Sequence, residues 1–115
     1  MLRGEIRLVD FGQALPSESA HQRPAVVVSN DGANSTAARL GRGVITVAPI
    51  TSNVSRVYPF QVLIPADESG LEYDSKVQAE QVRSISVERV RNTLGSVPAP
   101  LMLHVDEALR LHLAL

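Results

Sequence analysis

The alternation of apolar and polar residues predicts a series of short strands followed by one helix. Residues 5–11 begin with strict alternation, and the apolar phase shifts near Val9, which indicates a bent or bulged first strand. Residues 25–28 are continuously apolar and mostly β-branched, as in a strand that is covered on both faces. This second strand is expected to cover residues 25–29. Extended segments are also expected at residues 44–48, 60–64 and 93–97, and residues 76–85 should form one or two more.

Turn-forming residues separate these segments and predict how they are connected. Residues 12–22 predict a loop of roughly ten residues, a length that is more often functional than not. Residues 30–40 are expected to form a loop with one short helical turn, followed by a tight turn at residues 41–43. Pro49 is expected to end the third strand. An acidic turn at residues 65–73 and a single helical turn at residues 86–89 complete the connections.

The pattern changes period at residue 99, where an amphipathic helix is predicted to run to residue 115. Pro100 suits the first helical turn, and Asp106 and Arg110 have the spacing of a stabilising i,i+4 ion pair. The apolar face is formed by Leu101, Val105, Ala108, Leu109 and Leu115. Short strands with one terminal helix predict a mainly β fold with some α, built as a small, strongly bent sheet or open barrel.

Composition narrows the class of protein without identifying it. The 115 residues are 44% hydrophobic, which predicts one globular domain covering residues 1–115. Cysteine is absent, and we find neither an apolar run of membrane-spanning length nor a secretory leader. We therefore expect a soluble cytoplasmic protein. His104 and His112 lie on or beside the apolar face of the helix and no metal-ligand spacing is present, so no metal or other cofactor is expected.

The net charge of −1 conceals an uneven distribution. Residues 1–66 carry six arginines against four acidic residues, whereas residues 67–80 carry five acidic residues and one lysine. Arginine supplies ten of the eleven basic residues, and its planar guanidinium suits phosphate and nucleic-acid binding. A genome biased toward arginine codons would produce the same excess. With only two Phe and two Tyr, nucleic-acid recognition would depend on hydrogen bonds and arginine planes rather than on several stacked aromatics.

One group of residues could carry chemistry. Because Pro24 favours an extended residue before it, Arg23 is expected at the mouth of the second strand, with Thr51 and Ser52 at the end of the third. Glu18 and His21 lie in the loop that leads to Arg23. An arginine, a hydroxyl and a proton acceptor suffice for metal-free RNA cleavage, in which the 2′-hydroxyl is the nucleophile. A surface ion pair for Arg23 and a turn cap for Thr51 explain the same residues without any activity.

Six motifs, in order along nearly the whole chain, resemble the MazF/PemK-type toxins of type II toxin–antitoxin systems. The motifs are GEIRLVDF at residues 4–11, SE at 17–18, RPAVVVSN at 23–30, VAPITS at 47–52, YPFQV at 58–62 and AEQVRSI at 79–85. The resemblance implies a small SH3-like barrel of the CcdB/MazF type, with five to seven short strands and a C-terminal helix. It also implies a homodimer whose RNA groove is occupied by the acidic C-terminal segment of an antitoxin.

The activity that this resemblance implies is metal-independent, sequence-specific cleavage of single-stranded RNA. The expected products carry a 2′,3′-cyclic phosphate and a 5′-hydroxyl. By motif position, Arg23 and Thr51 match the catalytic arginine and threonine of the family, and Glu18 matches its loop glutamate. His21 remains an alternative general base. The residues expected to contact RNA are Ser17, His21, Ser52, Arg56, Gln81 and Arg83.

Two other functions would fit the same fold. A CcdB-like protein poisons DNA gyrase by binding, through a C-terminal helix end that carries a tryptophan. This chain ends in LHLAL and contains no tryptophan, which argues against a gyrase poison. A barrel that binds RNA or protein without cutting RNA is the third possibility.

Overall fold

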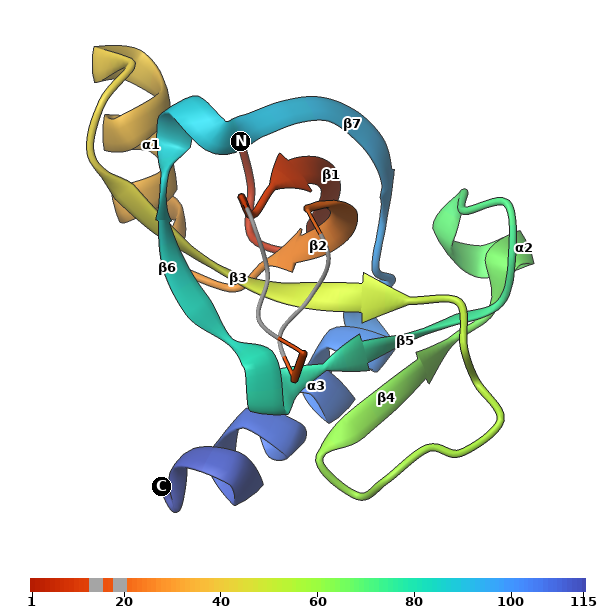
Figure 1. Cartoon of the computed structure of the whole chain (residues 1–115). Coiled ribbons are helices and arrows are strands. Elements are labelled where there is room, and N and C mark those ends of the chain that lie inside the picture. Colours follow the sequence, from red (N-terminus) through yellow and green to blue (C-terminus); the bar gives the residue numbers. More distant parts are fainter. Residues whose placement is uncertain (13–15, 18–20) are drawn as a thin grey trace.

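The strand β3 (Val44–Thr51) is the centre of the sheet in the computed structural model of the chain, shown in Figure 1. The structure describes residues 1–12, 16–17 and 21–115. Along one edge β3 pairs with β2 (Gln22–Val27), and its other edge is shared by two strands. The first half of β3 pairs with β6 (Arg83–Ser86), and its last two residues pair with β5 (Ser75–Gln78).

The remaining strands extend the sheet on both sides of this centre. β1 (Glu5–Asp10) follows β2, β7 (Val90–Ser96) follows β1, and β4 (Gln61–Ile64) pairs with β5. The order is β4-β5-β3-β2-β1-β7, with β6 beside β3 and every pairing antiparallel. Seven strands and a C-terminal helix confirm the predicted mainly β class, as an open sheet rather than a closed barrel. The register shifts beside Arg7 do not place a bulge in the first strand, because the extra residues lie on β7, whereas β1 pairs with β2 without a shift.

Pro49 lies inside β3 and does not end it, so the predicted end of this strand is wrong. The carbonyl of Thr46 accepts the N–H of Val28 (2.9 Å), so residues 46 and 48 direct their backbone groups toward β2. Residue 49 therefore faces the opposite edge, where the pairing with β6 ends at Val47 and the pairing with β5 begins at Ile50. The missing N–H of proline falls in this gap and removes no ladder bond.

The segment expected to be a loop with one helical turn is a ten-residue helix, α1 (Asp31–Leu40). Its polar composition suggested a loop, but tertiary contacts anchor the helix. Asn30 caps the N-terminus by accepting the N–H of Ala33 (2.8 Å), and Gly41 closes the other end in the left-handed region. Asn34 is fully buried and its amide donates to the carbonyl of Ser29 (2.8 Å), which ties the helix to the end of β2.

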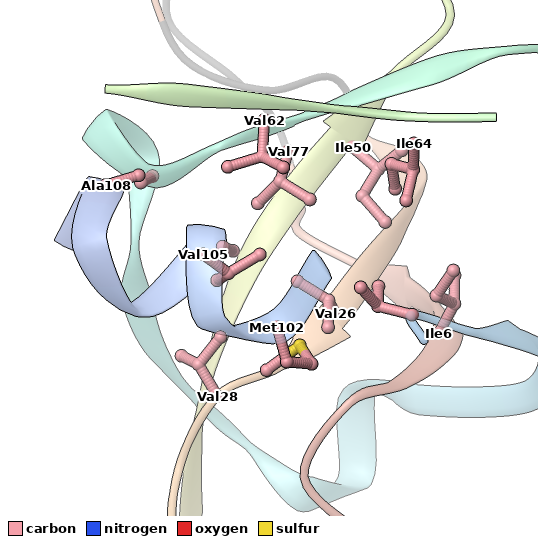
Figure 2. Packing of buried hydrophobic residues seen from close by; sticks show 13 residues of the cluster. Ile6, Val26, Val28, Ile50, Val62, Ile64, Val77, Met102, Val105 and Ala108 are labelled. Atoms are coloured by element: carbon pink, nitrogen blue, oxygen red, sulfur yellow. The ribbon is translucent and has the colours of Figure 1, made fainter. Parts of the chain in front are cut away.

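The C-terminal helix α3 (Ala99–Leu113) covers one face of the sheet, as predicted. Met102, Val105 and Ala108 form its buried side. Figure 2 shows these side chains packed against residues of several strands, including Val26 and Val77. A second cluster fills the other side of the sheet; its buried members are Val9, Phe11, Ala25, Val27, Ala37, Ile45, Val47 and Ile85. Alternating residues of β2 and β3 thus contribute to two cores, which explains why both strands are continuously apolar.

Two details of this helix differ from the prediction. Leu115 lies beyond the helix and is 85% exposed. Asp106 does not pair with Arg110, because Arg3 reaches it from the N-terminal segment (Nη2 to Oδ1, 2.6 Å). Arg110 pairs instead with Glu107 (2.7 Å). Periodicity places residues on a helix, but a partner from the other end of the chain appears only in the fold.

The short turns agree with the sequence. The acidic turn contains one helical turn, α2 (Ala66–Ser69), and a 3-10 turn η1 (Ala79–Gln81) separates β5 from β6. A second 3-10 turn, η2 (Val87–Arg89), is capped by Ser86 as expected. Among the described residues, no helix has the length and apolar character needed to cross a membrane.

Candidate active site

Arg23 lies within β2, paired with Val9 of β1, and not at the entrance of the strand. The pairing of β1 with β2 continues beyond Arg23, because the N–H of Phe11 donates to the carbonyl of His21 (2.6 Å). Pro24 keeps Arg23 extended, as expected, but the partner strand β1 moves the start of β2 to Gln22. The backbone of Arg23 is consequently fixed by the sheet, while its side chain remains half-buried at the surface.

The register of β2 against β3 brings Arg23 and Thr51 together. The ladder between β2 and β3 ends at the pair of Ala25 with Pro49, and Arg23 and Thr51 each lie two residues beyond it on their own strand. Side chains two residues apart along a strand point to the same face, and both residues line one pocket. Two residues that are distant in sequence are therefore neighbours, as the sequence-based hypothesis required.

A surface pocket of about 550 Å³ contains this pair. The pocket joins the ends of β2 and β3 to the segment after α2 and to β7. Its lining residues are Gln22, Arg23, Pro24, Ile50, Thr51, Ser52, Gly70, Leu71, Glu72, Tyr73, Ser75 and Leu94. Three of the predicted site residues, Arg23, Thr51 and Ser52, meet here. This volume lies in the range of about 300–1,000 Å³ that is typical of small-molecule sites.

The hydroxyl of Thr51 is already engaged as an acceptor. The N–H of Asn53 donates to Thr51 Oγ1 (3.2 Å), which forms a tight turn directly after β3. The hydroxyl proton is not used in this bond, so it can still be donated to a ligand. The turn therefore holds a hydrogen-bond donor in the pocket that Arg23 also lines.

Lys76 is a buried neighbour of this site that sequence reasoning treated only as one charge in an acidic stretch. It pairs with Thr51 across β3 and β5 and is 8% exposed. Its ammonium donates to the carbonyl of Arg56 (2.5 Å) and lies 5.9 Å from the ring centre of Tyr58. Lys76 thereby fixes the segment between β3 and β4. Strand alternation with the buried Val77 would place Lys76 at the surface, so the sequence carries no local signal for its burial.

Arg56 lies in that segment and does not line the pocket. Its guanidinium lies over the ring of Tyr58 (5.8 Å) and donates to the Tyr58 hydroxyl (3.3 Å). Tyr58 stacks in turn on Phe60, with ring centres 5.3 Å apart and planes 2° from parallel. Arg56 is thus exposed and rests on the ring of Tyr58, outside the pocket that Arg23 and Thr51 line.

Arg83 and Gln81, the other predicted RNA contacts of the β5–β6 region, also lie outside the pocket lining. Arg83, the first residue of β6, pairs with Val47 of β3, and its guanidinium lies 5.5 Å from the ring centre of Phe11. Gln81 lies in η1, half-buried. The structure brings Arg23, Thr51 and Ser52 together in one pocket, and it does not place Arg56, Arg83 or Gln81 in that lining.

The base of the long loop contains a histidine and an aspartate. His21 Nδ1 lies 3.5 Å from Asp10 Oδ1, and the His21 ring is 67% exposed. The N–H of Gly12 donates to Asp10 Oδ1 (2.9 Å) and lowers the pKa of this carboxyl; desolvation acts against it, while His21, Arg89 and Arg91 lower it further. Ser17 is described as exposed, and Glu18 lies outside the described residues.

The acidic stretch contributes to the pocket, which sequence reasoning missed. The sequence predicts only an acidic turn at residues 65–73. In the structure Glu72 and Tyr73 line the same pocket as Arg23. No local sequence signal connects residue 72 with residue 23, because the contact depends on how α2 packs against β7.

Metal ligation finds no support in the described ranges, where no three His, Cys, Asp or Glu side chains come together as a possible ion site. The chemistry available to the pocket is that of a guanidinium, hydroxyls and a carboxylate. Such groups can bind a phosphate and stabilise negative charge that develops on it.

Comparisons of the sequence with a family profile and with known proteins point to the same family. The profile described as the PemK-like, MazF-like toxin of type II toxin–antitoxin systems matches residues 2–113. The endoribonuclease MazF9 of Mycobacterium tuberculosis is 60% identical over 115 residues, which are 100% of this chain and 98% of that protein.

Solved structures agree with this result. The crystal structure of MazF from Deinococcus radiodurans aligns with a TM-score of 0.79 and 25% identity, over 100% of this chain and 97% of that one. A MazE–MazF structure from the same organism aligns with a TM-score of 0.75 and 26% identity, over 100% and 96% of the respective chains.

Proposed function

The chain belongs to the PemK-like, MazF-like toxin family of type II toxin–antitoxin systems, and on this basis we propose that its pocket cleaves single-stranded RNA. The relative that is 60% identical along the whole chain is an endoribonuclease. The observation that carries the assignment of the site is that Arg23 and Thr51 line one pocket at the ends of β2 and β3.

The reaction assigned to this pocket is transesterification at phosphorus. A general base removes the proton of the 2′-hydroxyl, the 2′-oxygen bonds to phosphorus, and the bond from phosphorus to the 5′-oxygen breaks. The leaving 5′-oxygen takes up a proton, so the products end in a 2′,3′-cyclic phosphate and a 5′-hydroxyl. No metal and no other cofactor enter this scheme.

Each residue has a defined role in the scheme. Arg23 binds two oxygens of the phosphate and stabilises the charge of the five-coordinate transition state. Thr51 donates its hydroxyl proton to the same group. Glu18 is proposed as the general base, and His21, which faces Asp10 at the base of the loop, is the alternative.

The partners follow from the family. We expect the toxin to act in the cytoplasm as a homodimer. An antitoxin with an acidic C-terminal segment would occupy the RNA groove. The arginines around the pocket, Arg23, Arg56 and Arg83, suit both an RNA backbone and an acidic peptide.

Replacing Arg23 tests the proposal. Arg23→Ala should lower kcat for a single-stranded RNA by about 1,000-fold, because a fixed donor to the developing charge is removed. Arg39→Ala is the matched control, since Arg39 lies on α1 near the start of β3 and Thr51 is at its end. The wild type should retain its activity in chelator, and its products should carry cyclic phosphate. Full activity in Arg23→Ala, or loss in chelator, would contradict the mechanism.

A further inference from the structure

The pocket is larger than a phosphate requires, and part of its lining is apolar. Arg23, Thr51 and Ser52 contribute a guanidinium and hydroxyls. Pro24, Leu71 and Leu94 provide apolar surface, and Gln22, Glu72 and Ser75 add polar groups. A site of about 550 Å³ with apolar walls and a few polar groups is typical of one that encloses a whole small ring system.

Tyr73 supplies an aromatic ring to this pocket. It is 63% exposed, and no ring contact or side-chain hydrogen bond joins it to another described residue. Tyr58 differs, because Phe60, Arg56 and Lys76 already cover its ring. Among contacts between described residues, none covers the ring of Tyr73, so of the two tyrosines it is the one that these residues leave open to a ligand.

The backbone around Tyr73 is held in place. The hydroxyl of Ser75 donates to the carbonyl of Tyr73 (2.9 Å), and the carboxylate of Asp74 accepts the N–H of Ala66 (2.8 Å). Gly70 packs against Gly95 of β7, where an added Cβ would lie 3.5 Å from its Cα. A ring on a fixed backbone loses little further entropy when a planar ligand stacks on it.

We propose that this part of the pocket, with Tyr73 as its stacking surface, binds the nucleobase of a nucleotide next to the scissile phosphate. The proposal rests on the proposed function, because Arg23 and Thr51 fix where that phosphate lies. Every base presents a π-face, and proteins that bind single-stranded RNA stack unpaired bases on aromatic rings. Gln22 and Glu72 can hydrogen-bond to the edge of the base, which makes this subsite a contributor to sequence selection.

The experiment combines a protein variant with a substrate that lacks one base. The substrates are an RNA oligonucleotide containing a mapped cleavage site, and two copies with an abasic ribonucleotide on either side of the scissile phosphate. For the intact RNA, Tyr73→Ala should lower kcat/KM by about 5- to 150-fold, the range of one base–aromatic stack. Tyr73→Phe should stay close to the wild type, because stacking needs the ring and not the hydroxyl.

The decisive comparison is made on the abasic substrates. On one of them, the wild type and Tyr73→Ala should cleave equally, because no base remains to stack. Leu40→Ala, which removes an exposed side chain on α1, should match the wild type on every substrate. If Tyr73→Ala retains full kcat/KM on intact RNA, or loses as much on both abasic substrates, the base subsite is wrong. Failure of the wild type to cut any RNA would instead contradict the proposed function.

Discussion

Thr51 shows how one side chain can shape the fold and still offer a hydrogen-bond donor to a ligand. Its oxygen accepts the N–H of Asn53 and shapes the turn after β3, while its hydroxyl proton remains available. Arg23, which lines the same pocket, has a backbone fixed by β1. The sheet thus brings a donor and a cation to one pocket before any ligand binds.

Two substitutions at Thr51 test whether its hydroxyl contributes to cleavage. Thr51→Ser keeps the hydroxyl and is expected to reduce kcat only a few-fold. Thr51→Val is nearly isosteric but donates no proton, so kcat should fall by about 10- to 150-fold, the value of one hydrogen bond to a charged group. Single-turnover cleavage of RNA measures both. Equal activity of the valine and serine variants would remove Thr51 from the mechanism.

Asp10 predicts a dependence of stability on pH. Its pKa is lowered in the fold, chiefly by the N–H of Gly12, so the unfolded chain binds a proton more readily. The stabilisation is complete above the ordinary value of 3.8 and is lost as the pH falls through the lower pKa of the folded protein. Asp10→Asn has no titrating carboxyl at this position and therefore lacks this pH-dependent stabilisation. The difference in Tm between the wild type and Asp10→Asn should therefore shrink from about pH 6 to about pH 3; a constant difference would contradict the assignment.

At the scale of elements, the pocket depends on the contact between α2 and β7. Gly95 of β7 faces the end of α2 so closely that an added Cβ would lie 2.0 Å from the main-chain oxygen of Ser69. This close approach positions Gly70 and the residues after it, which form one wall of the pocket. The glycine is required here for space, not for backbone conformation.

Gly95→Ala should therefore act on both stability and substrate binding. We expect a loss of about 1–3 kcal/mol in the free energy of unfolding, because main chain must move, together with a raised KM for RNA. Gly41→Ala is the control: an added Cβ has nothing within 4 Å, and its φ of +66° costs about 1 kcal/mol. Urea denaturation and steady-state cleavage distinguish them. A normal KM for Gly95→Ala would mean that α2 does not shape the site.

At the scale of the whole molecule, net charge is a poor guide to the partner. The chain carries −1 in total, yet Arg23, Arg56 and Arg83 lie on one group of neighbouring strands and turns. Acidic residues 67, 68 and 74 lie in or beside the turn around α2. Attraction for RNA must consequently be local, through individual phosphate contacts.

Such contacts predict a measurable salt dependence. With two or three phosphates bound, the logarithm of the affinity for single-stranded RNA should fall with the logarithm of salt concentration with a slope of about −1.4 to −2.1. Arg83→Ala should reduce the slope by about 0.7, the value for one phosphate contact. Arg39→Ala on α1 should leave it unchanged. Fluorescence anisotropy with a non-cleavable RNA measures the slope, and an affinity independent of salt would exclude phosphate binding as its main source.

The sequence by itself determined the properties that depend on local pattern. Period-two alternation placed most of the strands, and the apolar stripe of residues 101–109 placed α3. Ser86 marked the start of the turn η2. The spacing of Arg23 and Thr51 on consecutive strands sufficed to expect them near one another. The family was also recognisable, because six short motifs kept their order along the chain.

The tertiary structure alone decided what depends on contacts between distant segments. Pro49 continues β3 because β6 and β5 leave a gap beside it, and α1 forms because Asn34 is buried against Ser29. Asp106 pairs with Arg3 from the other end of the chain. The wall of the pocket with Tyr73 exists because α2 packs on Gly95. Local propensity cannot encode these features, since each is set by the free energy of a contact that forms only when distant segments of the chain have come together in the sheet.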